Sequence, residues 1–152
     1  MSTTVALGSS AVVAWITQSP GWIQVQRLID HPEVELVLPG VVLAGSIYVS
    51  REKGNVTSPT QIAATLSAVG MAVEPPTAGD LVRAGELVEA SRARPGPVNP
   101  LTGKEATLSL GDAVILAVTE RLGCPVVTRD RYWSIASAAG VTTAAVSQLP
   151  TT

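Results

Sequence analysis

Two aspartates late in the chain have the residue type and spacing that most favour chemistry. Asp112 lies in the first turn of a predicted helix that Ser109 would cap, and Asp130 follows the apolar segment Pro125–Thr128. The β-branched residues of that segment are typical of a strand buried on both faces of a parallel sheet. Parallel α/β proteins bind ligands at the carboxyl ends of their strands, where a helix could lean its first turn and bring the two carboxylates together. The alternative is that Asp112 only complements the helix dipole and Asp130 only forms a turn.

The composition limits the class of protein. The chain has 152 residues, of which 46% are hydrophobic and 14% are charged, and it contains no phenylalanine. These values are typical of a compact domain with a buried sheet, and they exclude a disordered chain. The net charge of −2 argues against a surface wholly devoted to nucleic acid, although a local basic rim is compatible with it.

Cysteine and histidine usage excludes several kinds of site. The single Cys124 has no partner for an internal disulfide, and one histidine, His31, is too few for a Cys/His metal site. We expect Cys124 to be a small core residue and the protein to be cytoplasmic. The N-terminus lacks the basic and apolar regions of a signal peptide, and we expect no membrane span.

Strand-like and helix-like segments alternate along the chain, which predicts an α/β protein with a mostly parallel central sheet and helices on both faces. Strands are predicted at residues 4–7, 34–38, 71–75, 125–128 and 141–146. Helices are predicted at residues 11–16, 19–29, 39–53, 60–69, 77–92, 109–122 and 134–139. We expect a single domain over residues 1–146 and a loose tail over 147–152. The loop 94–107 is the candidate for a mobile flap.

Four segments in this order resemble a known family. They are the turn Gly8–Ser10, the segment Pro39–Gly45, the helix start Leu108–Asp112 and the segment Pro125–Trp133. Together they resemble the PIN domain, and within it the VapC-like toxins of bacterial toxin–antitoxin pairs. The resemblance covers nearly the whole chain. It implies a three-layer α/β/α fold and a metal-dependent endoribonuclease with an acidic cluster at the carboxyl edge of its sheet.

The resemblance also implies a cluster of four carboxylates, of which this chain keeps two. Asp112 and Asp130 match the third and fourth acidic positions, whereas Gly8 and Gly45 stand at the first and second. Gly8 could instead supply an unusual backbone angle at the turn. Gly45 is harder to explain in this way, because a glycine inside a helix costs about 0.5–1 kcal/mol relative to alanine. Each glycine is one base change from the expected acid, so we favour loss of the site, by natural decay or deliberate change.

The remaining pair predicts weak metal binding. One or two carboxylates can hold Mg²⁺ when water and substrate phosphate complete its coordination, so Asp112 and Asp130 could still bind Mg²⁺ or Mn²⁺. Losing half of the cluster should raise the metal requirement and reduce or abolish turnover. Ser10 and Thr128 match positions that help to order the site in the family. The candidates to substitute for the missing acids, which the sequence does not place, are Asp80, Glu86 and Glu105.

Basic residues around the long loop and Asp130 favour contact with RNA. A rim of phosphate-binding side chains would form if the loop folded over the site. The candidates are Lys104, Arg129 and Arg131, together with Arg92 and Arg94 at the start of the loop. The alternative is that they are ordinary solvated charges. Tyr132 and Trp133 could stack on a base, but we favour Trp133 as a core or interface residue.

Three functions compete on these grounds. The first is an inactive PIN-like protein that still binds an antitoxin, a toxin partner or RNA, which the half-empty acidic cluster favours. The second is an active endoribonuclease toxin that works at a reduced level with Mg²⁺ or Mn²⁺. The third is a structural role through self-association, with a homodimer formed by the apolar surface of the second and third helices.

Overall fold

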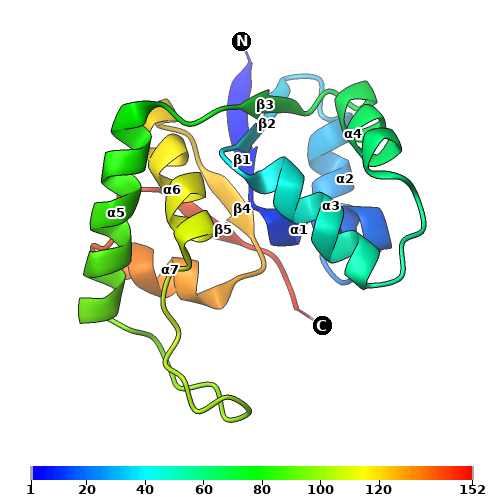
Figure 1. Cartoon of the computed structure of the whole chain (residues 1–152). Coiled ribbons are helices and arrows are strands. Elements are labelled where there is room, and N and C mark those ends of the chain that lie inside the picture. Colours follow the sequence, from blue (N-terminus) through cyan, green and yellow to red (C-terminus); the bar gives the residue numbers. More distant parts are fainter. Residues whose placement is uncertain (1, 152) are drawn as a thin grey trace.

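The computed structural model describes residues 2–151, and a five-stranded sheet lies at its centre (Figure 1). The strands are β1 (Thr3–Leu7), β2 (Val34–Pro39), β3 (Ala72–Glu74), β4 (Val126–Thr128) and β5 (Val146–Gln148). Their order in space is β3-β2-β1-β4-β5, and every neighbouring pair is parallel. The predicted parallel α/β fold is therefore confirmed.

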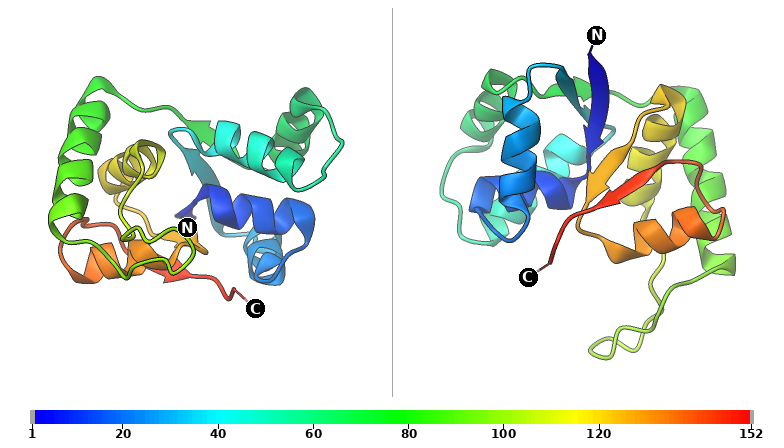
Figure 2. Two further views of the ribbon diagram at one scale, coloured as in Figure 1. Left: turned by 60° about the horizontal axis from the view of Figure 1, so that its bottom comes forward. Right: turned by 180° about the vertical axis from the view of Figure 1, so that it is seen from behind.

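Helices cover both faces of this sheet. They are α1 (Ser9–Thr17), α2 (Trp22–Asp30), α3 (Val42–Glu52), α4 (Pro59–Ala68), α5 (Ala78–Ala93), α6 (Leu110–Leu122) and α7 (Arg131–Ala138). In Figure 1, α3, α5 and α6 lie in front of the sheet, whereas the rear view in Figure 2 brings α2 and α7 to the front. Because the connections between parallel strands must cross a face of the sheet, this layering follows from the alternating pattern of the sequence.

The core is built from aliphatic side chains. Val5, Ala6 and Leu7 of the central strand are buried, and β4 is buried along its whole length. Helix α6 is buried from Ala113 to Thr119, because it packs against the sheet on one side and is covered by α5 on the other (Figure 2). With no phenylalanine in the chain, many small contacts replace a few large aromatic ones.

The last strand lies further along the chain than predicted. The expected strand over residues 141–146 is wrong, since β5 spans Val146–Gln148 and pairs with β4 through Val127 and Ser147. The segment after it is also less loose than expected. Leu149 is buried, and its backbone N–H donates to the carbonyl of Thr128 at 2.7 Å. Two residues of the predicted tail thus belong to the sheet and a third to the core.

Three helices begin three residues away from the predicted start, and the other four begin within two residues of it. The second begins at Trp22 rather than Ser19, after Gly21 with a φ of 97°. The third begins at Val42, because Pro39 is the last residue of β2. The last begins at Arg131 rather than Ser134.

The long loop does not cover the sheet edge as a flap would. Residues 96–106 form a narrow hairpin, in which Gly96 N–H donates to Ala106 at 2.7 Å and Val98 bridges to Glu105. The hairpin projects away from the body of the molecule (Figure 1). Leu101 at its far end is 94% exposed. The expected cover over the site is therefore not observed.

The half-buried carboxylate of Glu120 links α5, α6 and the segment before β5 through hydrogen bonds. Glu120 accepts hydrogen bonds from Arg83 Nε at 2.8 Å, from the Thr142 hydroxyl at 2.7 Å and from the Thr143 N–H at 3.0 Å. Burial alone would raise the pKa of Glu120, but these donors outweigh it and lower the pKa below its ordinary value. The carboxylate form therefore stabilises the folded state.

We predict that Glu120→Gln lowers the free energy of unfolding at pH 7 by about 1 kcal/mol, a small value because Arg83 is partly exposed and screened by water. The contribution of Glu120 is present above its unfolded pKa and is lost as the pH falls through its lower folded pKa. Urea unfolding measured from pH 3 to pH 7 should show the two proteins converging at acidic pH. A difference that is independent of pH would contradict the assignment.

Candidate functional site

The candidate site lies at the point where the strand order reverses. The chain passes from β1 towards β2 and β3 on one side, whereas β4 and β5 lie on the other side of β1. Open parallel sheets leave a crevice at the carboxyl ends of two such strands, because their connections run to opposite faces. Here the crevice lies between Gly8, which follows β1, and Arg129, which follows β4. The fold itself therefore selects this edge.

Asp112 and Asp130 both reach this edge from the starts of helices. Asp112 accepts from Ser109 N–H at 3.3 Å through Oδ2, which closes a capping box at the start of α6. Asp130 caps α7 by accepting from Tyr132 N–H at 2.9 Å through Oδ1. The structural roles considered from the sequence are thus real. They use one oxygen of each carboxylate, and both aspartates line the crevice at this edge of the sheet.

The two carboxyl groups influence each other. Burial raises the pKa of Asp112, and the nearby Asp130 raises it further, whereas hydrogen bonding with Ser109 and Trp133 lowers it. Burial also raises the pKa of Asp130. The structure therefore brings together the two aspartates that the sequence placed 18 residues apart. A pair of repelling, partly desolvated carboxylates favours a proton or a cation between them.

Ser10 and Thr128 join the two sides of the crevice. Their hydroxyl oxygens lie 3.1 Å apart, and Ser10 Oγ also accepts from Arg129 N–H at 2.9 Å. Thr128 Oγ1 accepts from Asp130 N–H at 3.0 Å. The pair thereby ties the first turn of α1 to the segment that carries Asp130, which supports its expected role in ordering the site.

We predict that Ser10→Ala lowers the free energy of unfolding by about 1–2 kcal/mol, because it leaves the N–H of Arg129 and the hydroxyl of Thr128 without this partner. Ser9→Ala is a matched control on the neighbouring residue and should change stability by less than about 0.5 kcal/mol. Urea unfolding compares the two. Equal losses of unfolding free energy in the two variants would show that the hydrogen bonds of Ser10 do not stabilise the fold.

A cavity of about 460 Å³ opens between these residues. Its wall contains both aspartates and both residues of the hydroxyl pair. Lys53, from the end of α3, and Thr151, from the end of the described chain, also line it and were not anticipated from the sequence. Their only signal would have been the topology, since neither belongs to a motif and only the fold brings the end of α3 and the end of the described chain to this edge.

The two glycines are packed tightly against neighbours. A Cβ at Gly8 would lie 3.2 Å from two ring carbons of Trp133 and 3.3 Å from the carbonyl oxygen of Val127. A Cβ at Gly45 would lie 2.7 Å from the hydroxyl of Ser9. The φ of Gly8 is −75°, so the suggested unusual backbone angle is wrong. Close approach of Trp133 and of the Val127 carbonyl, not backbone geometry, favours glycine at position 8, whereas the nearest atom to position 45 is the rotatable hydroxyl of Ser9.

The other acids considered from the sequence lie elsewhere. Asp80 pairs with Arg121 Nε at 2.9 Å, and Glu86 lies 3.9 Å from Arg83. Glu105 lies in the hairpin. None of these acids lines the cavity, so none of them replaces the carboxylates that the resemblance leads us to expect at positions 8 and 45.

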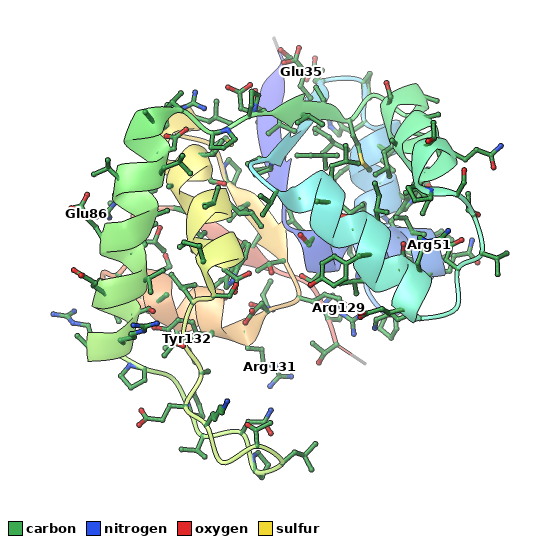
Figure 3. The ribbon with its side chains drawn as sticks, viewed as in Figure 1. Glu35, Arg51, Glu86, Arg129, Arg131 and Tyr132 are labelled. Atoms are coloured by element: carbon green, nitrogen blue, oxygen red, sulfur yellow. The ribbon has the colours of Figure 1, made fainter. Side chains whose placement is uncertain are left out.

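Some of the basic and aromatic residues considered from the sequence line the cavity, whereas others lie away from it. Arg129 lines the cavity, whereas Arg131 is exposed and extends outward beside α7 (Figure 3). Lys104 lies on the projecting hairpin and does not line the cavity. Tyr132 and Trp133 are both buried, and the Tyr132 hydroxyl donates to the carbonyl of Arg94 at 2.8 Å. Neither ring is presented for stacking on a base.

The residues present do not fit a four-carboxylate metal centre. Within residues 2–151, no group of three or more histidine, cysteine, aspartate or glutamate side chains is placed to hold a metal ion. Asp112 and Asp130 form a pair, and the crowding around Gly8 and Gly45 leaves no space there for a further carboxylate without movement of Trp133 and Ser9. A divalent ion at this pair would depend on oxygen ligands from outside the chain.

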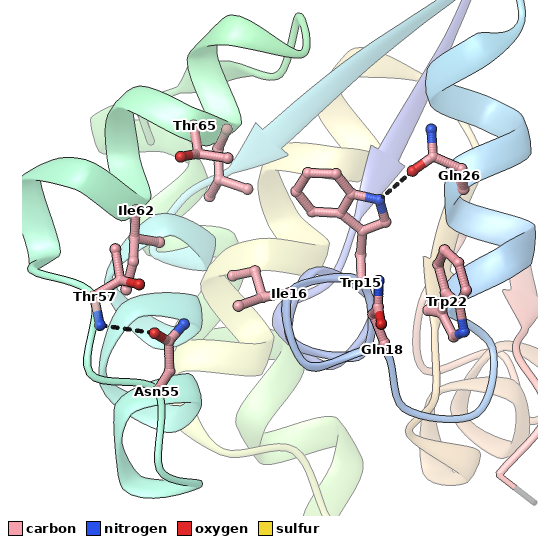
Figure 4. A pocket seen from close by; sticks show the side chains of 10 residues that line it. Trp15, Ile16, Gln18, Trp22, Gln26, Asn55, Thr57, Ile62 and Thr65 are labelled. Atoms are coloured by element: carbon pink, nitrogen blue, oxygen red, sulfur yellow. Dashed lines mark hydrogen bonds between the residues drawn. The ribbon is translucent and has the colours of Figure 1, made fainter.

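A second cavity, of about 320 Å³, lies between α1, α2 and α4 (Figure 4). Trp15, Ile16, Trp22, Ile62 and Leu66 give it an apolar lining. Polar side chains occupy the same wall, and the Trp15 indole N–H donates to Gln26 Oε1 at 2.8 Å. An apolar floor with polar groups around it is typical of a pocket that accepts a partner side chain or a small ligand.

Comparisons with known proteins agree with this architecture. The sequence profile of the PIN domain matches residues 5–139, and the chain therefore belongs to the PIN domain family. PIN domains are generally dependent on divalent metals. A comparison with curated protein sequences gives no match. No helix within residues 2–151 combines the length and the apolar character needed to cross a membrane.

Solved structures of toxin–antitoxin proteins share the fold. VapBC2 from Rickettsia felis, bound to a DNA fragment from its promoter, is 13% identical, with 97% of this chain and 100% of that chain covered and a TM-score of 0.65. FitAB bound to a DNA fragment is 14% identical, with coverages of 95% and 94% and a TM-score of 0.59. A toxin–antitoxin complex from Klebsiella pneumoniae is 13% identical, with coverages of 83% and 86% and a TM-score of 0.55. At these identities the similarity establishes the VapC-like fold alone.

Proposed function

We propose that the chain is a VapC-like PIN-domain protein of a cytoplasmic toxin–antitoxin pair, with little or no nuclease activity, that retains binding of an antitoxin and of RNA. The observation that carries the loss of activity is the crowding at positions 8 and 45. Neither glycine carries a carboxylate, so half of the expected acidic cluster is missing, and an added Cβ would lie 3.2 Å from the Trp133 ring at position 8 and 2.7 Å from the Ser9 hydroxyl at position 45. Catalysis through a metal-activated water would then lack half of its ligands.

RNA cleavage by the purified protein tests this part of the proposal. The substrate is a mixed-sequence oligoribonucleotide, with Mg²⁺ or Mn²⁺ at millimolar concentration. We expect no cleavage above that seen with Asp112→Asn. Cleavage by the parent that Asp112→Asn abolishes would instead establish the alternative, an active endoribonuclease. That alternative is supported by the paired carboxylates and the open cavity beside them.

Antitoxin binding is supported by the second cavity and by the neighbours in fold, which include toxin–antitoxin complexes. The cavity between α1, α2 and α4 would accept an apolar side chain of the antitoxin. We predict that Thr65→Arg, which places a long charged side chain at the cavity wall, weakens binding at least about 10-fold, the effect of a buried unpaired charge. Ser67→Arg, on an exposed position of the same helix, is the matched control.

Calorimetry with an antitoxin, sought first as a small protein encoded beside this gene, would measure this difference. Equal binding by the two variants would place the antitoxin elsewhere.

RNA contact is proposed for Arg129 at the cavity and for Arg131 and Lys104 outside it. A homodimer is also proposed, because Tyr48 on α3 and Ile23 on α2 are exposed apolar residues. Light scattering that found only monomer would remove the homodimer.

A further inference from the structure

The last described residues of the chain lie against the edge of the sheet that carries the candidate site. Leu149, which follows β5, is 5% exposed, and its N–H donates to the Thr128 carbonyl at 2.7 Å. A Cβ added at Gly21, between α1 and α2, would lie 3.2 Å from the Leu149 Cβ, so the turn there packs directly on this residue. The chain runs on past this turn (Figure 2) to Thr151, which lines the candidate cavity. We call residues 149–151 the strap.

Thr151 in the strap is bonded to both arginines that flank Asp130. Arg129 Nη2 donates to the Thr151 carbonyl at 3.4 Å, and Arg131 Nη2 donates to the Thr151 hydroxyl at 3.1 Å. Within residues 2–151, neither arginine forms a salt bridge with an acidic side chain. Two cationic side chains at this edge of the sheet therefore have a neutral residue as their hydrogen-bond partner.

This arrangement leaves the charge of both guanidinium groups without a counterion from the described part of the chain. A carbonyl and a hydroxyl accept hydrogen bonds, but they add no ion-pair attraction, which a phosphate would add. The phosphates of an RNA strand would therefore compete with Thr151 for the same N–H groups. Because Leu149 is the buried residue that keeps the strap in place, its packing decides how far the two arginines are available.

We propose that the strap is an autoinhibitory contact, in which residues 149–151 withhold Arg129 and Arg131 from RNA until a bound strand displaces Thr151. The inference rests on the proposed contact of these arginines with RNA, and it adds the element that regulates this contact. The opposite role, in which Thr151 positions the arginines for RNA, predicts weaker binding when the strap is released. Inhibition predicts tighter binding, so the two roles differ in sign.

Chemical modification of arginine with phenylglyoxal measures the hold of the strap without RNA. Leu149→Ala removes the anchor, and we expect Arg129 and Arg131 to react at least about 5-fold faster, because a protected group reacts at a rate that follows the population of the open form. Peptide mass spectrometry assigns the rate to each arginine. Arg51 is the internal control, since its guanidinium also donates to a backbone carbonyl, that of Thr57, and lies apart from the other two arginines (Figure 3). Its rate should not change.

Two further variants separate release of the strap from general loosening of the fold. Val141→Ala shortens another buried side chain, 4% exposed and outside the strap, and should leave both reaction rates within about 2-fold of the parent. Thr151→Val removes the hydroxyl but keeps the carbonyl, so it should speed the reaction of Arg131 by about 3-fold and leave that of Arg129 unchanged. Thermal melting confirms that each variant is folded, and Thr151→Val decides the matter if Leu149→Ala is not. Equal rates in Leu149→Ala and Val141→Ala would overturn the strap.

Binding of a fluorescein-labelled, mixed-sequence oligoribonucleotide tests the inhibition, with EDTA present and fluorescence anisotropy as the readout. We expect Leu149→Ala to bind about 3- to 10-fold more tightly than the parent, the effect of one or two hydrogen bonds that no longer compete with RNA. Equal or weaker binding by Leu149→Ala would overturn the inhibition alone. No binding by either protein would overturn the proposed RNA contact and the inhibition together, whereas the modification rates would still report the hold of the strap on the arginines.

Discussion

Carboxylates restored at positions 8 and 45 should generate Mn²⁺-dependent RNA cleavage only when Trp133 and Ser9 are changed as well. The expected active protein is the quadruple variant Gly8→Asp, Gly45→Glu, Ser9→Ala and Trp133→Phe. Its cleavage rate should exceed that of the parent by about 10- to 100-fold, the scale on which the supports of a metal site alter affinity or activity. The physical reason is space, since the ring carbons of Trp133 lie 3.2 Å and the hydroxyl of Ser9 lies 2.7 Å from the Cβ atoms that the new side chains would add.

The choice of compensating changes follows from the atoms that touch. Cζ3 and Cη2 of Trp133, which approach Gly8, belong to the outer edge of the indole, and phenylalanine lacks that second ring. Ser9→Ala removes the oxygen that lies 2.7 Å from a Cβ at position 45, and it leaves the Ser9 Cβ at 3.3 Å. Both substitutions are smaller than the originals, so the main cost is a modest loss of packing.

Two controls test whether cleavage requires the changes at Trp133 and Ser9 and the carboxylate of Asp112. Gly8→Asp with Gly45→Glu alone should remain at the parent's rate, and the quadruple variant carrying Asp112→Asn should lose cleavage. Circular dichroism melting of each protein separates inactivity from failure to fold. Equal activity in the double and quadruple variants would mean that Trp133 and Ser9 give way easily, and the loss of the site would then lie in the two glycines alone.

The location of the site was predictable because its signals are local. Asp112 follows Ser109 at the spacing of a capping box, and Asp130 follows a β-branched strand, so short motifs placed one carboxylate in the first turn of a helix and the other just past a strand. The alternation of strands and helices then put both at the carboxyl edge of a parallel sheet. The sequence predicts these positions because hydrophobic periodicity reflects which residues are buried along a single helix or strand.

The reason for Gly8 and the surroundings of the cavity were not predictable in this way. Gly8 and Trp133 are separated by most of the chain, and their contact exists only because β1 and β4 are neighbours. Lys53 reaches the cavity from the end of α3 for a similar reason. The strand β5 was misplaced because Val146–Gln148 is short and mostly polar, and only its pairing with β4 makes it a strand. Such features depend on tertiary contacts that no local pattern records.

Leu116→Ala should cause the largest loss of stability of any change considered for this protein, roughly 2–5 kcal/mol in the free energy of unfolding. Leu116 is 0% exposed at the centre of α6, between the sheet and α5. Its removal leaves a cavity that aliphatic neighbours can fill only in part, and the chain has no phenylalanine to shift into the space. Because α6 also presents Asp112, the loss bears directly on the site.

Leu110→Ala is the matched control, since it is the same substitution in the first turn of the same helix at a side chain that is 68% exposed. Its effect should stay within about 0.5 kcal/mol. Urea unfolding with an unchanged dependence on denaturant would attribute the difference to packing of the folded state. A loss below about 1 kcal/mol for Leu116→Ala would mean that α6 is loosely packed. In that case the position of Asp112 would have to be held by the Ser109 cap alone, and Ser109→Ala would become the more damaging change.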